Sequence, residues 1–221
     1  MSKTVTITLY RFFPSMTGRN FFTPYRSNIL TSKDSQFPSD EAIANQISSG
    51  SIDQIDLLVN RYSDRLFRII LRLTQSHGAS EDILQDTWIK VMRKIHQYDS
   101  SRPFFSWLMR IAVNGCRDYW RKEHRRRIWK NSFLSSKNGG SKLEETFIQE
   151  DNEMRENQVM ISHALSKISQ KLREVVVLKF YNGMTYEEIA QVLDIPAGTV
   201  KSRLHYALNK LKDHLILEGV K

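Results

Sequence analysis

The sequence predicts an all-α protein made of two helical domains that are joined by a flexible linker. Three observations lead to this prediction. Apolar residues recur at helical spacing through residues 39–130 and again through residues 154–221. Residues 131–153 are rich in Ser, Gly, Asn and acidic residues without a period, which is typical of a linker. No alternating strand pattern stands out beyond the N-terminal segment TVTITLY.

The composition is that of a basic globular protein. Of the 221 residues, 40% are hydrophobic and 26% are charged, and 33 Lys and Arg against 24 Asp and Glu give a net charge of +9. This charge favours nucleic acid or an anionic membrane surface as a partner, and a generically basic protein is the open alternative. No apolar run approaches the roughly 20 residues of a membrane helix, so no membrane insertion is expected.

The single cysteine, Cys116, excludes an intramolecular disulfide, and this fits a reducing cytoplasm as the location. Because Cys116 lies within a helical pattern, we expect a small core residue rather than a redox sensor.

Residues 1–38 differ from the rest of the chain. They contain five basic residues and one acid, Asp34, and their aromatic residues follow no period. We therefore expect a disordered basic extension that is dispensable for function.

The first predicted domain, residues 39–130, should contain four helices. Ser39 precedes the acidic residue Asp40, and Ser80 precedes Glu81, so each serine is expected to cap a helix whose first turn is acidic. The four helices are expected to start at Asp40, to run from Asp56 to Gln75, from Glu81 to about His96, and from Phe104 to about Arg127.

The third of these helices carries an unusual outer face. Its core stripe includes Trp88, whereas the opposite side presents Asp82, Gln85, Asp86 and Ile89. An apolar residue among acids indicates a surface that docks a protein, although a single exposed apolar residue is also common.

The fourth helix has a basic face. Arg110, Asn114, Arg117 and Arg121 lie opposite its apolar stripe, and Tyr98 and other aromatic residues lie close by. Basic side chains interleaved with aromatic rings are typical of single-stranded nucleic-acid binding, with Asn114 placed to read a base edge. The alternative is a solvated basic face over core aromatics.

The second domain, residues 154–221, contains a helix-turn-helix pattern. Thr185 and Glu188 form a capping box, and Pro196 suits the first position of a following helix. The outer face of that helix should read duplex bases at its centre and meet phosphates at its flanks. The central residues are Thr199, Ser202, His205 and Tyr206, and the flanking residues are Lys201 and Arg203.

Two motifs resemble a known family. The stretch SEDILQDTW from Ser80, followed by F-x-W-L-x-x-I-A-x-N-x-x-x-D-x-x-R from Phe105, resembles region two of extracytoplasmic-function (ECF) sigma factors of the sigma-70 family. The stretch Y-x-E-I-A-x-x-L-x-I-P-x-G-T-V-K-S-R-L from Tyr186 is similar to their region four. The two motifs occur in the family's order.

The resemblance implies a role for each candidate residue. Asn114 matches a position that reads a flipped base of the minus-ten element, and Tyr98 matches an aromatic residue lining that pocket. Gln85 and Asp86, beside Ile89, match the surface that docks on the polymerase clamp coiled coil. The outer face of the second helix matches the minus-thirty-five contacts. Ser169 stands where the family often has Pro, and His205 and Tyr206 also depart from many members, so the promoter sequence cannot be transferred.

The function expected from this resemblance is that of an RNA polymerase sigma factor, with the polymerase clamp and flap, promoter DNA and an anti-sigma factor as partners. No catalytic, metal-binding or cofactor motif is visible, so we expect no enzyme and no cofactor. Two alternatives are a stand-alone helix-turn-helix regulator, which has no use for the docking face at Ile89, and an adaptor that has lost DNA binding, against which Asn114, Lys201 and Arg203 argue.

Overall fold

The computed structural model describes residues 38–133 and 162–217, and within these ranges every regular element is a helix. The all-α prediction is confirmed. The predicted N-terminal extension, the TVTITLY segment and most of the predicted linker lie outside the described residues. The described residues all belong to one compact unit.

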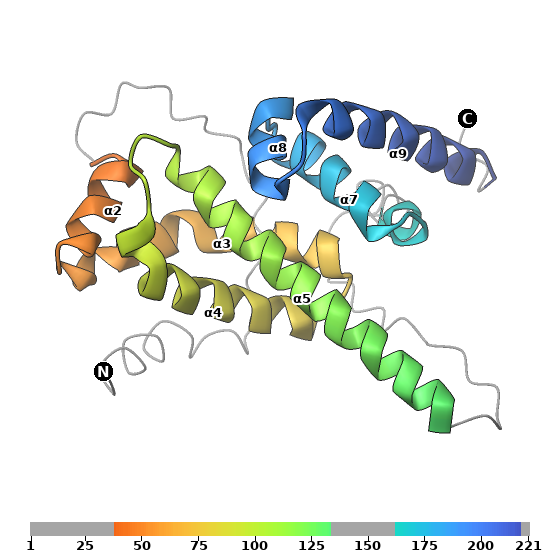
Figure 1. Ribbon diagram of the computed structural model, residues 1–221, viewed down its shortest axis with the longest axis horizontal. Helices are drawn as coiled ribbons and strands as arrows, with labels where there is room; N and C mark the ends of the chain where they lie inside the picture. Colours follow the sequence, from red (N-terminus) through yellow and green to blue (C-terminus); the bar gives the residue numbers. More distant parts are fainter. Residues whose placement is uncertain (1–37, 134–161, 218–221) are drawn as a thin grey trace, which may run out of the picture. The chain divides into compact units, whose positions relative to one another are not determined.

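The first group of helices forms the N-terminal domain, which Figure 1 shows in orange to green. Helices α3, α4 and α5 pack against one another, and α2 packs on α3 and α5. Its core contains large apolar side chains that are completely or almost completely buried, including those of Leu66, Trp88 and Leu108. The elements are α2 (Asp40–Ser48), η1 (Ile52–Gln54), α3 (Ile55–Thr74), α4 (His77–Lys94), η2 (Ile95–Gln97) and α5 (Phe104–Phe133).

Helix α2 has the predicted cap and also fastens the start of α5. The hydroxyl of Ser39 accepts a hydrogen bond from the backbone N–H of Ala42 at 3.2 Å. In the same first turn, a carboxylate oxygen of Glu41 accepts the backbone N–H of Phe104 at 3.2 Å. Glu41 therefore satisfies one of the free N–H groups at the start of a helix 63 residues away in the sequence.

The prediction that Ser80 caps the third helix is wrong. Helix α4 begins at His77, and its cap is Ser76, whose hydroxyl accepts the N–H of Ala79 at 3.4 Å. Ser80 is completely buried, and its hydroxyl donates to the Ser76 carbonyl at 2.6 Å and lies 2.8 Å from the hydroxyl of Thr74. The serine that looked like a cap is thus part of a buried polar cluster between α3 and α4.

Helix α5 is longer than predicted, because it continues past Arg127 to Phe133 and takes in the first residues of the predicted linker. In the basic stretch at the end of α5, one acid pairs with two cations on the same side of the helix, which supports the helical conformation. Glu123 forms ion pairs with Arg126 at 2.9 Å and Arg127 at 3.3 Å. Long basic side chains are also good helix formers, so no residue in this stretch stops the helix.

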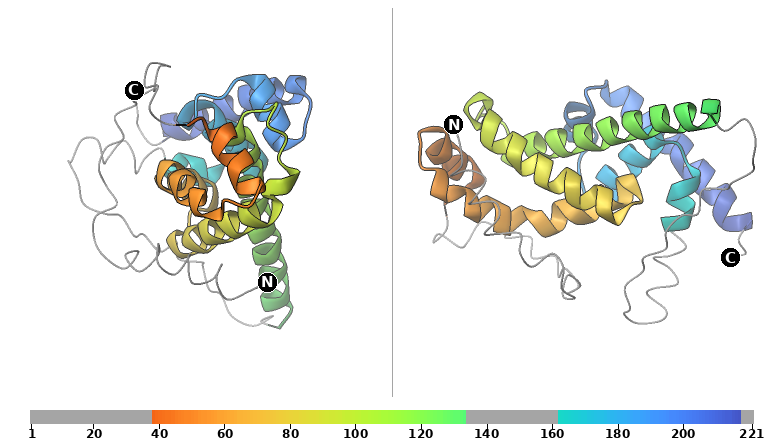
Figure 2. Two further views of the ribbon diagram at one scale, coloured as in Figure 1. Left: turned by 90° about the vertical axis from the view of Figure 1, so that its left-hand side faces the viewer. Right: turned by 90° about the horizontal axis from the view of Figure 1, so that it is seen from below.

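The second group of helices forms the C-terminal domain, which consists of a helix over residues 162–167, then α7 (Gln170–Val176), the π-helix η3 (Val177–Tyr181), α8 (Tyr186–Leu193) and α9 (Ala197–Leu217). Helix α9 packs on both α7 and α8, and Figure 2 shows the three helices from two further sides.

The predicted helix-turn-helix is confirmed as α8 and α9. The capping box is complete, since Thr185 accepts the N–H of Glu188 at 3.2 Å and Glu188 accepts the N–H of Thr185 at 2.7 Å. Asp194 ends α8 in the left-handed conformation, with φ of 58°. Helix α9 begins at Ala197, one residue later than expected, and the carbonyl of Pro196 accepts its first hydrogen bonds.

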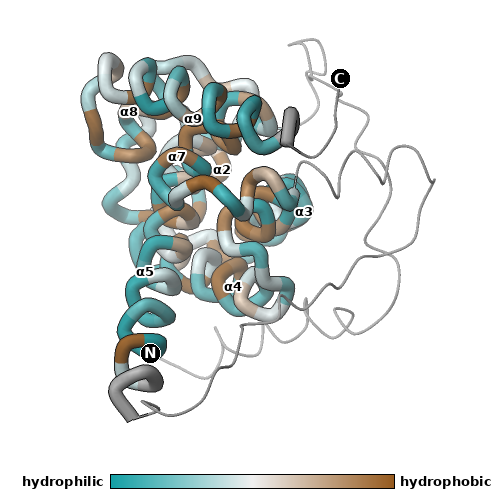
Figure 3. The backbone as a smooth tube through the Cα atoms, turned by 90° about the vertical axis from the view of Figure 1, so that its right-hand side faces the viewer, coloured by the Kyte–Doolittle hydropathy of each residue, from teal (hydrophilic) through white to brown (hydrophobic). Residues whose placement is uncertain are grey.

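Hydrophobic segments lie mainly where the helices meet, as the tube coloured by hydropathy shows (Figure 3). Leu208 on α9 is an exception, because it is 42% exposed while its neighbour Ala207 is completely buried. In the part of the chain that the structure describes, no helix has an apolar stretch long enough to cross a membrane.

Candidate nucleic-acid interface

One side of α5 carries polar and basic side chains at alternating spacings of three and four residues. Trp107, Arg110, Asn114, Arg117 and Arg121 follow one another along this side, as the helical period requires. Arg110, Asn114 and Arg121 are exposed, whereas Trp107 and Arg117 are half-buried. We call these five residues the α5 face. Its cations and its amide can meet the phosphates and a base edge of a nucleic-acid strand.

Aromatic rings gather at the N-terminal end of the α5 face. The ring of Tyr98 lies 5.3 Å from that of Trp107 and meets the ring of Phe104 edge-on at 5.5 Å. The Tyr98 hydroxyl donates to the carbonyl of Arg102, which holds the ring in place. Burial, together with nearby acids, raises the pKa of Tyr98 to about 12, so this ring stays neutral at physiological pH. The cluster can stack a base.

Two of the arginines on the α5 face are engaged by the C-terminal domain. The guanidinium of Arg117 donates to the two carboxylate oxygens of Glu174 at 3.0 and 2.7 Å and to the carbonyl of Leu193 at 3.3 Å. Hydrogen bonding to Glu174 raises the pKa of Arg117 above its ordinary value. Arg110 lies 3.6 Å from the carboxylate of Asp194, with both side chains largely exposed.

The outer face of α9 presents a second polar surface, separate from α5. Lys201, Ser202, His205 and Tyr206 are exposed, Tyr206 with an exposed fraction of 55%. The ring nitrogen Nε2 of His205 lies 3.2 Å from the amide nitrogen of Asn209, one turn further along the helix. The remaining predicted members, Thr199 and Arg203, are half-buried at the edge of this surface. Its width and polarity suit a helix that enters a major groove.

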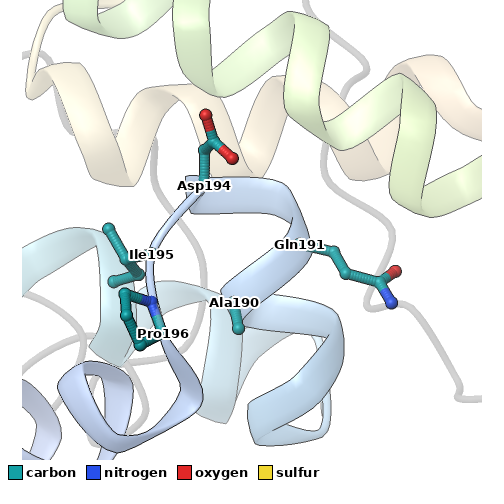
Figure 4. A pocket seen from close by; sticks show the side chains of 5 residues that line it. All are labelled: Ala190, Gln191, Asp194, Ile195 and Pro196. Carbon is teal, nitrogen blue, oxygen red and sulfur yellow. The ribbon is translucent and has the colours of Figure 1, made fainter.

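The turn between α8 and α9 forms an open depression lined by Ala190, Gln191, Asp194, Ile195 and Pro196. Figure 4 shows that Asp194 stands at the end of α8, with its carboxylate directed away from Pro196. This is the carboxylate that faces Arg110. The turn therefore serves both to orient α9 and to place an acid against α5.

The predicted docking residues lie on one side of α4, opposite the completely buried Trp88. Asp82, Gln85 and Asp86 are exposed, whereas Ile89 is half-buried. The expected acidic surface with an apolar residue at its edge is present, but less of Ile89 is available to a partner than its pattern indicated.

Arg173 and Glu174 on α7 escaped the sequence analysis, although they connect the two domains. Both are buried, at 5% and 2% exposure, next to the apolar run that follows them. A charged pair that directly precedes several core valines was the signal that could have revealed them, because Arg and Glu are almost never fully buried without partners.

Within residues 38–133 and 162–217, no group of three or more His, Cys, Asp or Glu side chains is arranged to hold a metal ion. The chemistry of the two faces is that of binding: cations for phosphates, amides and hydroxyls for base edges, and aromatic rings for stacking.

Two family models match the chain. Sigma-70 region 2 covers residues 58–126, from α3 to most of α5, and Sigma-70, region 4 covers residues 164–213, from the helix at residues 162–167 to most of α9. The α5 face lies in the first match and the outer face of α9 in the second, which confirms the predicted division into two domains.

Relatives match most of the chain. It is 26% identical over 182 residues to the ECF RNA polymerase sigma-E factor of Haemophilus influenzae, covering 80% of this chain and 95% of that protein. It is 29% identical over 179 residues to the ECF RNA polymerase sigma factor SigW of Bacillus subtilis, covering 77% of this chain and 93% of that protein.

Solved structures share the fold. The chain resembles CnrH in its complex with the cytosolic domain of CnrY, with a TM-score of 0.61 and 25% identity over 82% of this chain and 100% of CnrH. The sigma factor RpoE, solved with the anti-sigma factor NepR from Bartonella quintana, has a TM-score of 0.58 at 22% identity, over 73% of this chain and 96% of that one.

Proposed function

Because the chain belongs to the sigma-70 family and is an RNA polymerase sigma factor of the extracytoplasmic-function type, we propose that its two exposed faces divide promoter recognition between them. Such a factor directs core polymerase to specific promoters and stabilises the melted DNA. The proposal assigns melted single-stranded DNA to the α5 face and duplex DNA to the outer face of α9.

The α5 face is proposed to bind the minus-ten element. Asn114 would read one flipped base, and the cluster around Tyr98 and Trp107 would stack against it, which offsets part of the unstacking cost of a few kcal/mol. Arg110, Arg117 and Arg121 would neutralise the phosphates of the same strand. The observation that carries this assignment is the exposed Asn114 in the middle of a basic helix side that ends in an aromatic cluster.

The outer face of α9 is proposed to read the minus-thirty-five element. Ser202, His205 and Tyr206 are exposed at its centre and can reach base edges, with Thr199 beside them. Lys201 and Arg203 stand on the flanks, where a cation meets phosphate without reading sequence.

The exposed acidic side of α4, with Asp82, Gln85, Asp86 and Ile89, is proposed to dock on the clamp coiled coil of core polymerase. The C-terminal domain would contact the flap. We also propose that the protein works in the cytoplasm, where its polymerase is, and that an anti-sigma factor controls it. CnrH, at 25% identity, was solved with a protein partner of its own, the cytosolic domain of CnrY.

The role of Asn114 is tested by the variant Asn114→Ala in complexes of core polymerase with promoter DNA. We expect the variant to form closed complexes with normal affinity but to open fewer promoters, seen as weaker permanganate reactivity of thymines in the melted region. Asn60→Ala, which removes an exposed amide from α3, is the matched control and should open promoters normally. Loss of duplex affinity together with normal opening would contradict the assignment and favour a regulator that binds only duplex DNA.

A further inference from the structure

On the outer face of α9, two residues of one turn are contacted by side chains from the next turn. The amide nitrogen of Asn209 lies 3.2 Å from the ring nitrogen Nε2 of His205, and the ammonium of Lys210 lies 5.7 Å from the centre of the Tyr206 ring. Side chains of a helix lean towards its N-terminus, which brings residues 209 and 210 over residues 205 and 206. The residues that are proposed to read bases therefore have neighbours that can fix their orientation.

The contact between Asn209 and His205 sets the position of the proton on the imidazole ring. The amide nitrogen of an asparagine donates hydrogen bonds and accepts none. Because Asn209 approaches Nε2 of His205 through this nitrogen, Nε2 is the acceptor and carries no proton. The ring of His205 is then neutral, with its single proton on Nδ1. The contact thus selects one of the two tautomers, and it excludes the doubly protonated ring, in which both nitrogens are donors.

This tautomer decides what His205 offers to the edge of a base. With Nε2 occupied by Asn209, the polar group that remains on the ring is the N–H at Nδ1, which is a donor. In the major groove, guanine presents acceptors at N7 and O6, whereas cytosine presents the N4 amino group, which is a donor. A donor on His205 therefore suits guanine and does not suit cytosine.

We propose that Asn209 is a positioning residue for the recognition of duplex DNA. It fixes His205 in the form that donates from Nδ1, and this form favours guanine over cytosine at the base that His205 reads. The proposal rests on the assignment of His205 to base reading in the minus-thirty-five element. Asn209 is exposed and follows Ser202 by two turns, so it lies on the same side of α9 as the other residues of this face.

Substitutions of Asn209 should act on recognition without disturbing the fold. A contact between exposed side chains one helical turn apart adds little to the stability of a helix. Both Asn209 and His205 are exposed, and neither belongs to the core of the C-terminal domain. Loss of the Asn209 amide should therefore leave α9 folded and change only the ring of His205.

Nitrogen-15 NMR of the full-length protein tests the tautomer directly, because a ring nitrogen that carries a proton differs widely in chemical shift from one that does not. The measurement is made without DNA at pH 8, where histidine side chains in water are neutral. The chain has six histidines, and the signals of His205 are those that are missing from His205→Ala. We expect the proton on Nδ1 in the parent protein and a mixture of both tautomers in Asn209→Leu, which lacks the donor.

Two further variants serve as controls in the same spectra. Lys210→Leu removes the neighbouring contact with Tyr206 from the same turn and should leave the ring nitrogens of His205 unchanged. Asn209→Gln keeps an amide within reach of His205 and should retain the tautomer of the parent protein. A proton mainly on Nε2 in the parent protein, or an unchanged spectrum of His205 in Asn209→Leu, would overturn the proposal.

Sequence preference is then measured with core polymerase that carries the full-length protein and with a pool of duplexes of random upstream sequence, also at pH 8. His205→Ala identifies the base pair that His205 reads, as the position at which preference is lost. At this pair we expect Asn209→Leu to lower the preference for guanine over cytosine about three- to tenfold, which corresponds to one hydrogen bond. Lys210→Leu should weaken binding to all sequences alike and keep this preference. A preference of the parent protein for cytosine at this pair would contradict the proposal.

A double variant shows whether Asn209 acts through His205. If it does, His205→Ala combined with Asn209→Leu should have the same preferences as His205→Ala alone. A further loss of preference in the double variant, or a loss at another base pair, would show that Asn209 contacts DNA itself. Either result would overturn its role as a positioning residue.

The two measurements separate the inference from the proposed function. The tautomer of His205 is measured without DNA, so a parent protein that has the expected tautomer but enriches no duplex sequence would overturn the assignment of duplex DNA to α9. Enrichment of sequences whose preferences are unaffected by Asn209→Leu would instead overturn the inference and leave the proposed function intact.

Discussion

Leu73 and Arg173 are a hundred residues apart in the sequence, and the guanidinium of Arg173 donates a 3.0 Å hydrogen bond to the carbonyl of Leu73. The same carbonyl also accepts the indole N–H of Trp120 at 3.3 Å. It belongs to the last turn of α3, where carbonyls lack partners within the helix. Side chains from α5 and α7 thus complete the end of α3.

Replacing Arg173 should destabilise the protein strongly. Arg173→Met keeps an apolar stem of similar length but leaves buried carbonyls without a donor, and we expect a loss of about 3 kcal/mol in the free energy of unfolding. Urea denaturation followed by circular dichroism measures this loss. The control is Lys171→Met on the exposed side of the same helix. Equal effects of the two substitutions would show that the buried hydrogen bonds of Arg173 contribute nothing specific.

Reversing one charge on α4 should abolish binding to core polymerase. Asp86 is exposed within the proposed docking surface, so Asp86→Arg places a cation there without disturbing the core. We expect the variant to fail to co-purify with core polymerase while its circular dichroism spectrum stays helical. Asp53→Arg makes the same charge change at an exposed position of η1 and should bind normally. Undiminished binding by Asp86→Arg would rule out this surface.

Alanine substitutions at the centre and at the edge of the outer face of α9 should have different effects on DNA binding. Tyr206→Ala should relax sequence preference at one upstream base pair by about 1–3 kcal/mol, because the exposed ring lies where base edges are read. Arg203→Ala should weaken binding to all sequences alike and lower the salt slope by about one. Competition binding at several salt concentrations measures both effects. The reverse pattern would mean that the assigned centre and flank of α9 are exchanged.

Cys116 should be unreactive in the folded protein. Its side chain is buried, and burial raises the pKa of the thiol above its ordinary value of 9.0, so little thiolate forms at neutral pH. Above pH 9, the thiol of Cys116 ionises in the unfolded chain but stays protonated in the folded protein. This difference should lower the free energy of unfolding as the pH rises. We expect labelling by a disulfide reagent at pH 8 to occur only as fast as the protein opens. Rapid labelling without added denaturant would make Cys116 a candidate redox sensor.

The local rules of helix formation made much of the fold predictable from the sequence. Thr185 and Glu188 carry a complete start signal within four residues, and the structure shows both of its hydrogen bonds. The exposed Asn114 and the buried Trp88 follow from the helical period alone. Ser80 shows the limit of such signals, since Ser76 offers the same cap one turn earlier and tertiary burial decides between the two.

The contact between the domains could not be predicted, because it depends on pairs that are far apart in the sequence. Nothing near Arg117 indicates that its carboxylate partner lies 57 residues away on α7. The helical period put Arg117 on the same side as Asn114, and this is correct. Only the packing of α7 and α8 against α3 and α5 shows that Arg117 is already paired.

Transcription in vitro tests the central claim most directly. Core RNA polymerase is mixed with the full-length protein and a library of genomic promoter fragments, and the 5′ ends of the transcripts are sequenced. The account predicts initiation that depends on the protein, at start sites that share two sequence elements, one upstream and one in the melted region. Transcripts that appear equally with and without the protein, or binding to the upstream element without any initiation, would contradict it.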